Sequence, residues 1–295
     1  MYSPSQTKTY SRCRFKWFLS KFLGVDYATI GKRDLAAGVG TAVGAAIQAH
    51  YLHKGSLSVE ELVKQAESRY AFEVAQRTAT GRTVQDCEEA EKYPGMIPGM
   101  IHAFLKTNPI PKEWTVDACE APVNDDYAAY LDLAGTCPRG VWIADVKCKM
   151  TEKAGYVSNS LLKFQFDPQL LQYCREWSKK KGQNVQFYRI IYVVGSPVPL
   201  CRYQDFEVDW DYMALREQAD EVIWWDMKAA EIGLKNLKDL YGSYTAIPLE
   251  KVMLYAPMAP EHMDGIFKCD MWDPCLLYSG DVSSSPDYIS IERKK

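Results

Sequence analysis

The sequence contains no long apolar run, and this absence excludes a protein anchored by a membrane-spanning helix. Such a helix needs about 20 consecutive apolar residues, and no stretch of the 295 residues approaches that length. The first residues are polar and basic and lack the apolar segment of a secretory signal, so we expect no export. We therefore expect a cytoplasmic protein without membrane association.

A disulfide framework and internal repeats are also missing. The nine cysteines are an odd number and lie scattered along the chain. Without an export signal, reduced thiols or metal ligands are expected rather than bridges. The absence of a repeat excludes a solenoid or a propeller, which leaves an ordinary globular protein.

The chain lacks the overall positive charge of many nucleic-acid-binding proteins, because its net charge is −3. Basic residues are nevertheless concentrated in residues 1–33, where Asp26 is the single acid. They are Lys8, Arg12, Arg14, Lys16, Lys21, Lys32 and Arg33. This local excess could contact a polyanion, although a solvated helix face would have the same composition.

Helix signals dominate the first 110 residues. Ser3 and Pro4 are typical of a helix start, and Ser58 with Glu61 forms a capping box. We predict helices over residues 3–22, from 40 past 50, over 58–81, and over 86–106, the last kinked or split by two Pro-Gly pairs.

Strand signals follow. We predict a three-stranded meander over 114–123, 127–136 and 141–149. A helix capped by Asp167 and ending at three lysines should follow. After it we predict a buried central strand over 185–195, a short strand near Phe206 and a helix over 209–233. This order predicts an α/β fold with a mixed central sheet flanked by helices and a helical N-terminal region. The predicted segments are 1–110, 111–210, 211–280 and a flexible tail over 281–295.

Three charged residues of the meander could form a site. Asp145 and Lys147 are two positions apart on one strand and therefore point to the same face. An antiparallel hairpin could bring Asp132 near Asp145, at about 5 Å for facing positions. Two carboxylates that close would repel each other unless a cation lies between them, and a hard divalent ion would fill that role.

These residues resemble the motif of the PD-(D/E)XK nuclease superfamily, within its RecB-like branch of phage exonucleases and CRISPR-associated nucleases. Asp132 and Asp145-Val146-Lys147 match the pattern Asp, then Asp/Glu-x-Lys. Gln169 and Tyr173 match the branch's Gln-x-x-x-Tyr helix. The starting segment SPSQTKTYSRCRFKWFL and the helix GTAVGAAIQAH also resemble the branch, so the resemblance covers roughly residues 2–200.

The resemblance implies a restriction-endonuclease-like core and metal-dependent hydrolysis of DNA, as in recombination, repair or phage DNA processing in a bacterial or phage-infected cell. Asp132, Asp145 and the carbonyl of Val146 would hold Mg²⁺ or Mn²⁺, and Lys147 would orient the attacking water. Gln169 and Tyr173 would position the phosphate or support Lys147. The expected DNA-backbone contacts, to single- or double-stranded DNA, are Lys8, Arg12, Arg14, Lys16, Lys179 and Lys180. The chain could also form a homo-oligomer or bind a recombination partner.

One departure from the family pattern concerns its metal-binding histidine, because Gly44 stands at that position. Gln48, one helical turn later, could fill the gap, and Glu120 is a further candidate ligand. His50 is six residues on and should point elsewhere. The change could mean weaker metal affinity, a rearranged set of ligands or lost activity.

A second departure concerns cysteine. Relatives with an iron–sulfur cluster use one cysteine near the N-terminus and three near the C-terminus. Cys13, Cys269 and Cys275 resemble three of the four, one fewer than a cubane cluster requires, so we expect no cluster.

Two alternatives to a nuclease remain open. A catalytically impaired DNA-binding or assembly protein could use the same scaffold, as the missing histidine suggests. Otherwise the motif could be a surface hairpin whose Asp145 and Lys147 form an ordinary same-face pair.

Overall fold

A five-stranded β-sheet is the centre of the larger part of the chain. The structure, a computed structural model, describes residues 4–27, 29–84, 88–123, 130–257 and 288–290. The sheet has the strand order β4-β5-β6-β7-β8, in which β6 and β7 are parallel and all other neighbours are antiparallel. The strands are β4 Thr115–Pro122, β5 Tyr130–Cys137, β6 Gly140–Thr151, β7 Val185–Ser196 and β8 Leu200–Glu207.

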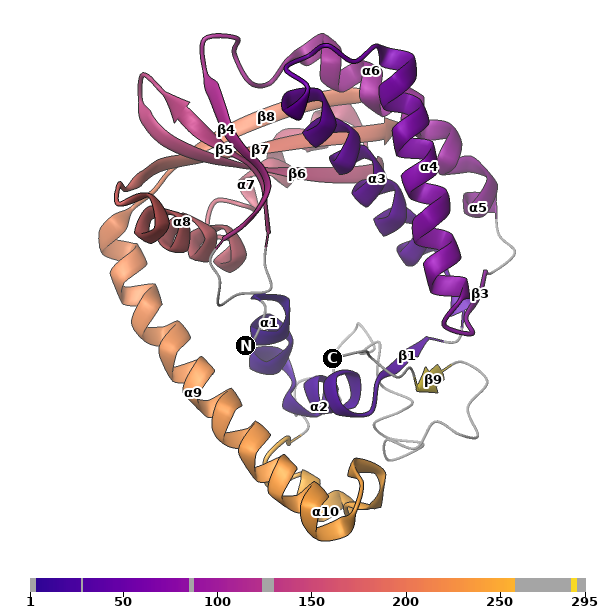
Figure 1. Cartoon of the computed structure of the whole chain (residues 1–295), viewed down its shortest axis with the longest axis vertical. Helices are drawn as coiled ribbons and strands as arrows, with labels where there is room; N and C mark the ends of the chain where they lie inside the picture. The colour runs from indigo at the N-terminus through magenta and orange to yellow at the C-terminus, as the bar shows by residue number, and fades with distance from the viewer. Residues whose placement is uncertain (1–3, 28, 85–87, 124–129, 258–287, 291–295) are drawn as a thin grey trace. The chain divides into compact units, whose positions relative to one another are not determined.

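Helices cover both faces of this sheet (Figure 1). On one face, α3 (Lys32–Leu52), α4 (Val59–Thr78) and α6 (Ile97–Thr107) share a core with Trp142 and Phe187 of the sheet. On the other face, residues of α7 (Val157–Leu162) and α8 (Pro168–Lys181) pack against the opposite side of β6 and β7. The structure therefore confirms the predicted α/β class with a mixed central sheet.

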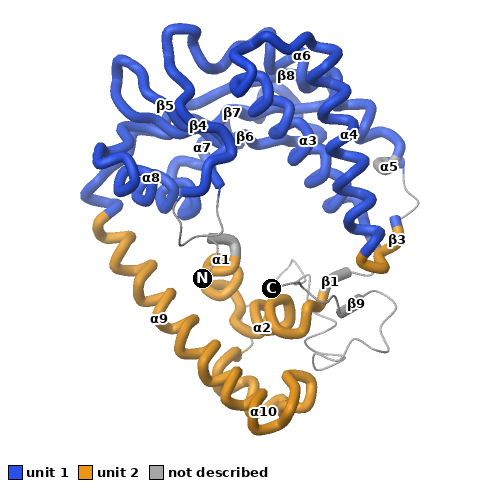
Figure 2. Tube along the Cα trace, in the orientation of Figure 1, with its two compact units in different colours: residues 1, 30–79, 84–213 blue, residues 2–29, 80–83, 214–295 orange. Residues whose placement is uncertain are grey.

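The chain divides into two compact units, which Figure 2 colours separately. We call residues 30–79 and 84–213 the sheet unit. We call residues 2–29, 80–83 and 214–295 the helical unit. Each unit has its own apolar core.

Local sequence signals explain several helix ends of the sheet unit. Ser58 and Glu61 form the predicted capping box at the start of α4. Asp167 accepts a hydrogen bond from the Gln169 amide at the start of α8, and Gly182 ends that helix with a φ of 65°. The prolines divide the predicted fourth helix into α5 (Glu88–Lys92), a 3₁₀ turn over Pro94–Met96, and α6.

The helical unit contains α1 (Pro4–Arg12), α2 (Arg14–Phe22), most of α9 (Trp210–Tyr241) and α10 (Leu249–Val252). Its core joins Phe15 and Leu19 of α2 to Met227 and Leu234 of α9. The prediction of one helix over residues 3–22 was wrong. Cys13 has extended backbone angles, and its sulfur accepts the Lys16 amide to start a second helix.

Other boundaries also differ from prediction. Helix α3 begins at Lys32 rather than near Gly40, and α9 continues to Tyr241. Short elements that were not predicted are β1 (Val25–Tyr27), β2 (Thr29–Ile30), β3 (Thr83–Val84), 3₁₀ turns at Ala154–Tyr156 and Tyr244–Ala246, α7, and β9 (Tyr288–Ser290). Strand β9 pairs with β1, so residues 288–290 of the predicted tail are ordered. Among the described helices, none combines the length and apolar character needed to cross a membrane.

Candidate active site

The site lies where β5 and β6 cease to pair. Their paired residues run from Cys137–Gly140 to Leu133–Ala144, while β6 continues beside β7 as far as Thr151. Asp132 and Asp145 are the next residues of the two strands beyond the last printed pair of the ladder. The Asp132 carboxylate accepts a 2.7 Å hydrogen bond from the Val146 amide. A side chain thus satisfies a β6 amide beyond the end of the ladder.

Helix α3 contacts Asp132 from outside the sheet. Gln48 is buried, and its Nε2 donates to Asp132 Oδ1 over 3.4 Å. Glu120 of β4 also acts on Asp132, because its charge raises the pKa of that carboxyl. Its φ of 46° is left-handed, which is uncommon for a residue other than glycine. The two further candidate ligands, Gln48 and Glu120, therefore lie close to Asp132.

Asp145 and Lys147 form an ion pair within β6. The Lys147 ammonium lies 2.8 Å from Asp145 Oδ2, and Asp145 is only 7% exposed. The ring centre of Phe164 lies 5.9 Å from the ammonium. The structure thus brings Asp132, Asp145 and Lys147 together.

Negative charge exceeds positive charge at this point of the sheet. Burial raises the pKa of Asp132, and the charge of Asp145 raises it further, while the Val146 amide and Lys147 compensate in part. Burial likewise raises the pKa of Asp145, with Lys147 opposing and Asp167 reinforcing the shift. Burial disfavours the charge on Lys147, but its carboxylate neighbours outweigh this and raise its pKa. One ammonium serves several carboxylates, so a further cation would relieve repulsion.

Gln169 and Tyr173 meet on the first two turns of α8. Gln169 Nε2 donates to the Tyr173 hydroxyl over 2.6 Å. Burial raises the pKa of Tyr173, the Gln169 hydrogen bond lowers it, and Asp145 adds a smaller raising effect. The Gln169–Tyr173 pair therefore lies within electrostatic range of the carboxylates.

A tyrosine of the sheet forms hydrogen bonds with the loop before α8. The Tyr188 hydroxyl of β7 donates to the carbonyls of Phe164 and Gln165. Asp167, at the end of this loop, caps α8 and acts on both Asp145 and Lys147. Sequence reasoning identified Asp167 as a cap but missed its place beside the site; its position two residues before Gln169 was the available signal.

The donor set fits a hard divalent cation. Among the described residues, no group of three or more His, Cys, Asp or Glu side chains is arranged to hold a metal. The protein ligands would therefore be Asp132, Asp145 and the Val146 carbonyl, with water completing the shell, as Mg²⁺ tolerates. The partly buried Asp132 and the buried Asp145, with Lys147 as the ammonium paired to Asp145, are the structural observation that favours such an ion.

Gly44 lies one helical turn before Gln48 on α3. A Cβ atom at Gly44 would meet nothing within 4 Å, so the backbone leaves room for a side chain. His50 does not replace the missing histidine, because its ring packs against Tyr51 and Phe104 and burial lowers its pKa. The prediction that His50 points elsewhere agrees with these contacts.

Several of the basic residues expected to contact DNA already have partners. Arg14 pairs with Asp226, Lys179 with Glu176, and the Lys180 ammonium donates to the Pro122 carbonyl. Lys179 and Lys180 lie at the opposite end of α8 from Gln169, about 15 Å away at 1.5 Å per residue.

The N-terminal candidates lie outside the sheet unit. Lys8 and Arg12 are exposed on α1, and Lys16 is half-buried on α2, in the helical unit. The buried Cys13 caps α2 there, whereas Cys269 and Cys275 fall outside the described residues.

Sequence reasoning missed a second group of cations, which follows Lys147 along the chain. Lys149, Lys153 and Lys163 are exposed and form no ion pair with a described residue. Lys149 is two positions after Lys147 on β6, and Lys163 precedes Phe164. The signal was present in residues 147–166, which contain four lysines and one acid, Glu152.

The mixed sheet, its flanking helices and the acidic site where β5 and β6 separate define a restriction-endonuclease-like α/β protein. The family model of the PD-(D/E)XK nuclease superfamily matches residues 1–194 of the 295. The chain therefore belongs to the PD-(D/E)XK nuclease superfamily. This superfamily consists generally of nucleases that act on DNA and typically use divalent metals. No curated protein matches the chain.

Proposed function

We propose that the chain is a metal-dependent deoxyribonuclease, an exonuclease of the RecB-like branch that acts in recombination, repair or phage DNA processing. The observation that carries the proposal is the meeting of Asp132, Asp145 and Lys147 in one partly buried site with excess negative charge. Membership of the nuclease superfamily supports the reaction class.

Asp132, Asp145 and the Val146 carbonyl would hold Mg²⁺ or Mn²⁺. When bound, such an ion supplies Lewis acidity and lowers the pKa of water. Lys147 would hold the attacking water by a hydrogen bond and offset the charge that develops on the phosphate. Gln169 and Tyr173, already joined to each other, would position the scissile phosphate or support Lys147.

The cations available to the substrate favour a sequence-tolerant enzyme. Lysine contacts to phosphates position DNA without reading its bases. Lys149, Lys153 and Lys163 are proposed as such contacts, alongside Lys8, Arg12, Arg14, Lys16, Lys179 and Lys180. An exonuclease tolerates any sequence, which fits this mode of binding.

The decisive test is Lys147→Ala, assayed on labelled single- and double-stranded DNA with Mg²⁺ or Mn²⁺ and with EDTA blanks. Removing the ammonium should lower the cleavage rate by about 100-fold or more, while DNA binding and the circular-dichroism spectrum stay close to wild type. Cleavage at the wild-type rate would exclude Lys147 from the mechanism.

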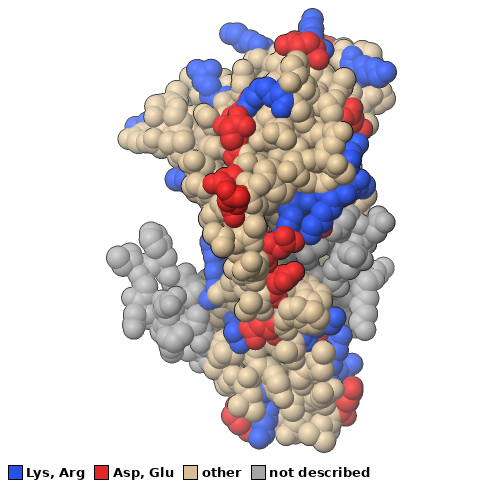
Figure 3. Space-filling view, turned by 90° about the vertical axis from the view of Figure 1, so that its left-hand side faces the viewer, with Lys and Arg blue, Asp and Glu red and all other residues tan. Residues whose placement is uncertain are grey.

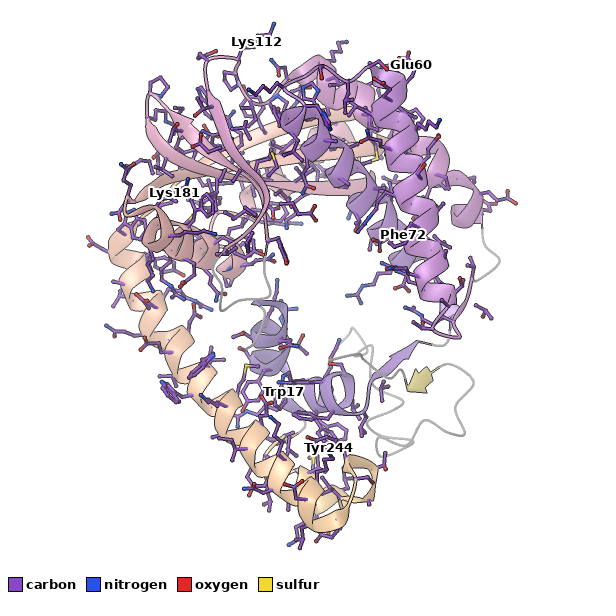
Figure 4. The ribbon with its side chains drawn as sticks, in the orientation of Figure 1. Trp17, Glu60, Phe72, Lys112, Lys181 and Tyr244 are labelled. Carbon is purple, nitrogen blue, oxygen red and sulfur yellow. The ribbon has the colours of Figure 1, made fainter. Side chains whose placement is uncertain are left out.

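Lys112→Ala is the matched control. Lys112 is an exposed lysine in the loop before β4, at the top of the sheet unit in Figure 4. This variant should cleave DNA as the wild type does, so a loss confined to Lys147→Ala reports the site rather than overall charge.

One observation favours a second candidate, a catalytically impaired DNA-binding or assembly protein on the same scaffold. Gly44 offers no ligand, and among the described residues no group of three or more His, Cys, Asp or Glu side chains is arranged to hold a metal. This candidate predicts DNA binding by the wild-type chain without cleavage in either metal, which the same assay measures.

A further inference from the structure

A stretch of chain without acidic residues joins β6 to α8 in the sheet unit. We call residues 153–166 the β6–α8 connection; it includes α7, and it contains two lysines but no aspartate or glutamate. Three of its large apolar side chains lie at the surface, with Tyr156 61%, Leu162 55% and Phe166 57% exposed. Single exposed apolar residues are ordinary, but three of them with two lysines in one connection are a candidate binding surface.

The β6–α8 connection adjoins the candidate active site. The ring centre of Phe164 lies 5.9 Å from the Lys147 ammonium. Phe166 follows two residues later, and two residues span at most about 7 Å between their Cα atoms. Asp167, the residue after Phe166, acts on the charge of Lys147. A ligand on Phe166 would therefore lie next to the carboxylates and the ammonium of the site.

Hydrogen bonds fix the backbone that carries Phe166. The buried Tyr188 hydroxyl donates to the carbonyls of Phe164 and Gln165. The Asp167 amide donates to the Phe164 carbonyl over 3.2 Å. The exposed ring of Phe166 is thus presented by an ordered turn, and a preformed surface loses less entropy when it binds a ligand.

The ring of Phe166 is supported at one side and open elsewhere. Its centre lies 5.4 Å from that of Tyr212, with 62° between the ring planes. Tyr212 belongs to the sheet unit and contacts Phe166 in an edge-to-face arrangement. The exposed Asp211 follows Asp209 beside Tyr212, so no phosphate contact is assigned to the Tyr212 side of Phe166. The remaining surface of the Phe166 ring is free to stack on another planar group.

The charge of the connection favours an anionic ligand. Lys153 and Lys163 are exposed and form no ion pair with a described residue. Glu152, just before the connection, accepts the Ser160 hydroxyl over 2.6 Å, and Asp167, just after it, accepts a backbone amide at the start of α8. Figure 3 shows the molecule from the side of α8, where basic side chains gather in groups beside uncharged surface.

We infer that the β6–α8 connection binds an unpaired strand of DNA beside the candidate active site. A base stacks on the ring of Phe166, Tyr156 offers a second ring, and Lys153 and Lys163 contact the phosphates. The inference rests on the proposed nuclease function, which makes DNA the ligand of the adjoining site. Sites for single strands combine cations along the backbone with aromatic rings on which bases of any sequence stack.

A nucleotide matches both features of the connection, the rings and the lysines. In duplex DNA the bases are already stacked on one another, so a duplex would contact the lysines through its phosphates and leave the rings in water. An apolar protein surface would cover the rings and leave the lysines without counter-charges. An unpaired strand supplies a planar ring and an anion in every nucleotide, so it fits the connection better than either.

The first experiment measures binding of a labelled single strand of about 16 nucleotides by fluorescence anisotropy in EDTA. Phe166→Ala should raise the dissociation constant by about five- to 150-fold, the effect of losing one base–aromatic stack. Phe166→Tyr keeps a ring in place and should bind as tightly as the wild type. Circular dichroism of each variant checks that the fold is intact.

Phe72→Ala is the matched control. Phe72 is a 49% exposed phenylalanine of α4, one of the helices that cover the other face of the sheet from α8 (Figure 4). The variant removes an exposed ring of the same kind and should bind the single strand as the wild type does. A loss equal to that of Phe166→Ala would show that the effect is not specific to the connection, and it would overturn the inference.

The second experiment separates stacking from phosphate contacts with an abasic strand of the same length. The abasic strand keeps every phosphate but offers no base, so Phe166→Ala should bind it as tightly as the wild type does. Lys153→Ala with Lys163→Ala should weaken binding of both strands. If Phe166→Ala lost equal affinity for both strands, the stacking of a base on Phe166 would be overturned.

Binding in EDTA is measured apart from the proposed metal-dependent reaction. Wild-type affinity of Phe166→Ala for the single strand, or a wild-type chain that binds the single strand no better than the abasic strand, would overturn the inference even if the chain cleaves DNA. A loss confined to Phe166→Ala and to strands with bases would support it even if the wild type cleaves no DNA in Mg²⁺ or Mn²⁺. The two proposals can therefore fail separately.

Discussion

Gly44 and Gln48 lie one helical turn apart on the same face of α3, and of the two only Gln48 has a side chain that could contact the site. Gln48 contacts Asp132 through its amide nitrogen, so this face of α3 is aimed at the carboxylates. Gly44 shares the face one turn earlier and contributes no side chain. The space around the Gly44 Cβ position is open, so a larger side chain could be placed there without a clash.

Gly44→His should therefore add a ligand. We expect Mn²⁺ affinity, measured by isothermal titration calorimetry, to rise by about tenfold or more over the wild type, because the imidazole supplies a further metal ligand. A tenfold rise corresponds to about 1.4 kcal/mol. If the wild-type chain is catalytically impaired, this variant should also gain cleavage activity.

Gly44→Ala separates ligation from helix propensity. Alanine stabilises a helix interior by about 0.5–1 kcal/mol relative to glycine, but it offers no metal ligand. Equal Mn²⁺ affinity of the alanine and histidine variants would contradict the assignment of position 44 to the metal site.

The end of β6 and the segment after it carry exposed cations that follow Lys147 in the sequence. Lys147 is engaged with Asp145, whereas Lys149, Lys153 and Lys163 are exposed. The Glu152 carboxylate accepts the Ser160 hydroxyl over 2.6 Å instead of pairing with these lysines. The segment is therefore available to a polyanion.

Lys153→Ala with Lys163→Ala should weaken DNA binding and make it less dependent on salt. For two lost phosphate contacts, the slope of log K against log salt should fall by about 1.4 on single strands and 1.8 on duplex DNA. Fluorescence anisotropy of labelled DNA in EDTA measures this. Lys112→Ala is the control, and an equal change in that variant would show that only net charge matters.

Strands β7 and β8 are joined by a buried guanidinium. Arg189 is 4% exposed and donates to both oxygens of Asp205 over 2.6 and 2.9 Å, with Trp114 and Tyr203 on its faces. Burial opposes the charge on Asp205, but the hydrogen bonds and charges of Arg189 and Arg139 outweigh it and hold the pKa of Asp205 below its usual 3.8.

Asp205→Asn should lower the free energy of unfolding at pH 7 by about 3 kcal/mol, because it leaves Arg189 buried without a counter-charge. A carboxyl with a lowered folded-state pKa stabilises the protein above its unfolded pKa and loses that effect as the pH falls below about 4. Urea unfolding from pH 7 to pH 3 should show the two proteins converging. The control, Glu207→Gln, changes an exposed partner of Arg139 and should have little effect. A difference that stays constant down to pH 3 would contradict the ionic role of Asp205.

At the scale of the whole molecule, each unit is built from segments that are distant in the sequence. Residues 2–29 share a core with α9, and α3 packs on a sheet whose first strand begins more than sixty residues later. The proposed metal ligands come from two strands whose pairing ends at Leu133 and Ala144. An ion that binds them binds the folded state alone.

Mn²⁺ should therefore stabilise the whole sheet unit. At 100 times its dissociation constant, an ion specific for the folded state adds about 2.7 kcal/mol, which would raise the thermal midpoint by several degrees in calorimetry. Asp145→Asn should abolish the shift, and EDTA should reverse it in the wild type. A midpoint that rises equally in Asp145→Asn would place the bound ion elsewhere.

The sequence alone determined the elements whose signals are local. The capping box at Ser58, the cap at Asp167 and the alternation of the meander depend on neighbouring residues, so they were predicted correctly. The break at Cys13 was not predicted. An extended residue between two helices has no strong local signature, and its conformation depends on the packing of Phe15 and Leu19.

Only the tertiary structure decided which side chains meet. The spacing of Asp145 and Lys147 predicted a shared face, but the end of the β5–β6 ladder, the Val146 amide bound by Asp132 and the reach of Gln48 depend on register and on helix packing. The two faces of α9 were equally hidden, since the exposed Val222 and Trp225 could have been core until the face with Met227 was seen to be buried. Sequence determines periodicity, and packing determines which side of each element meets solvent.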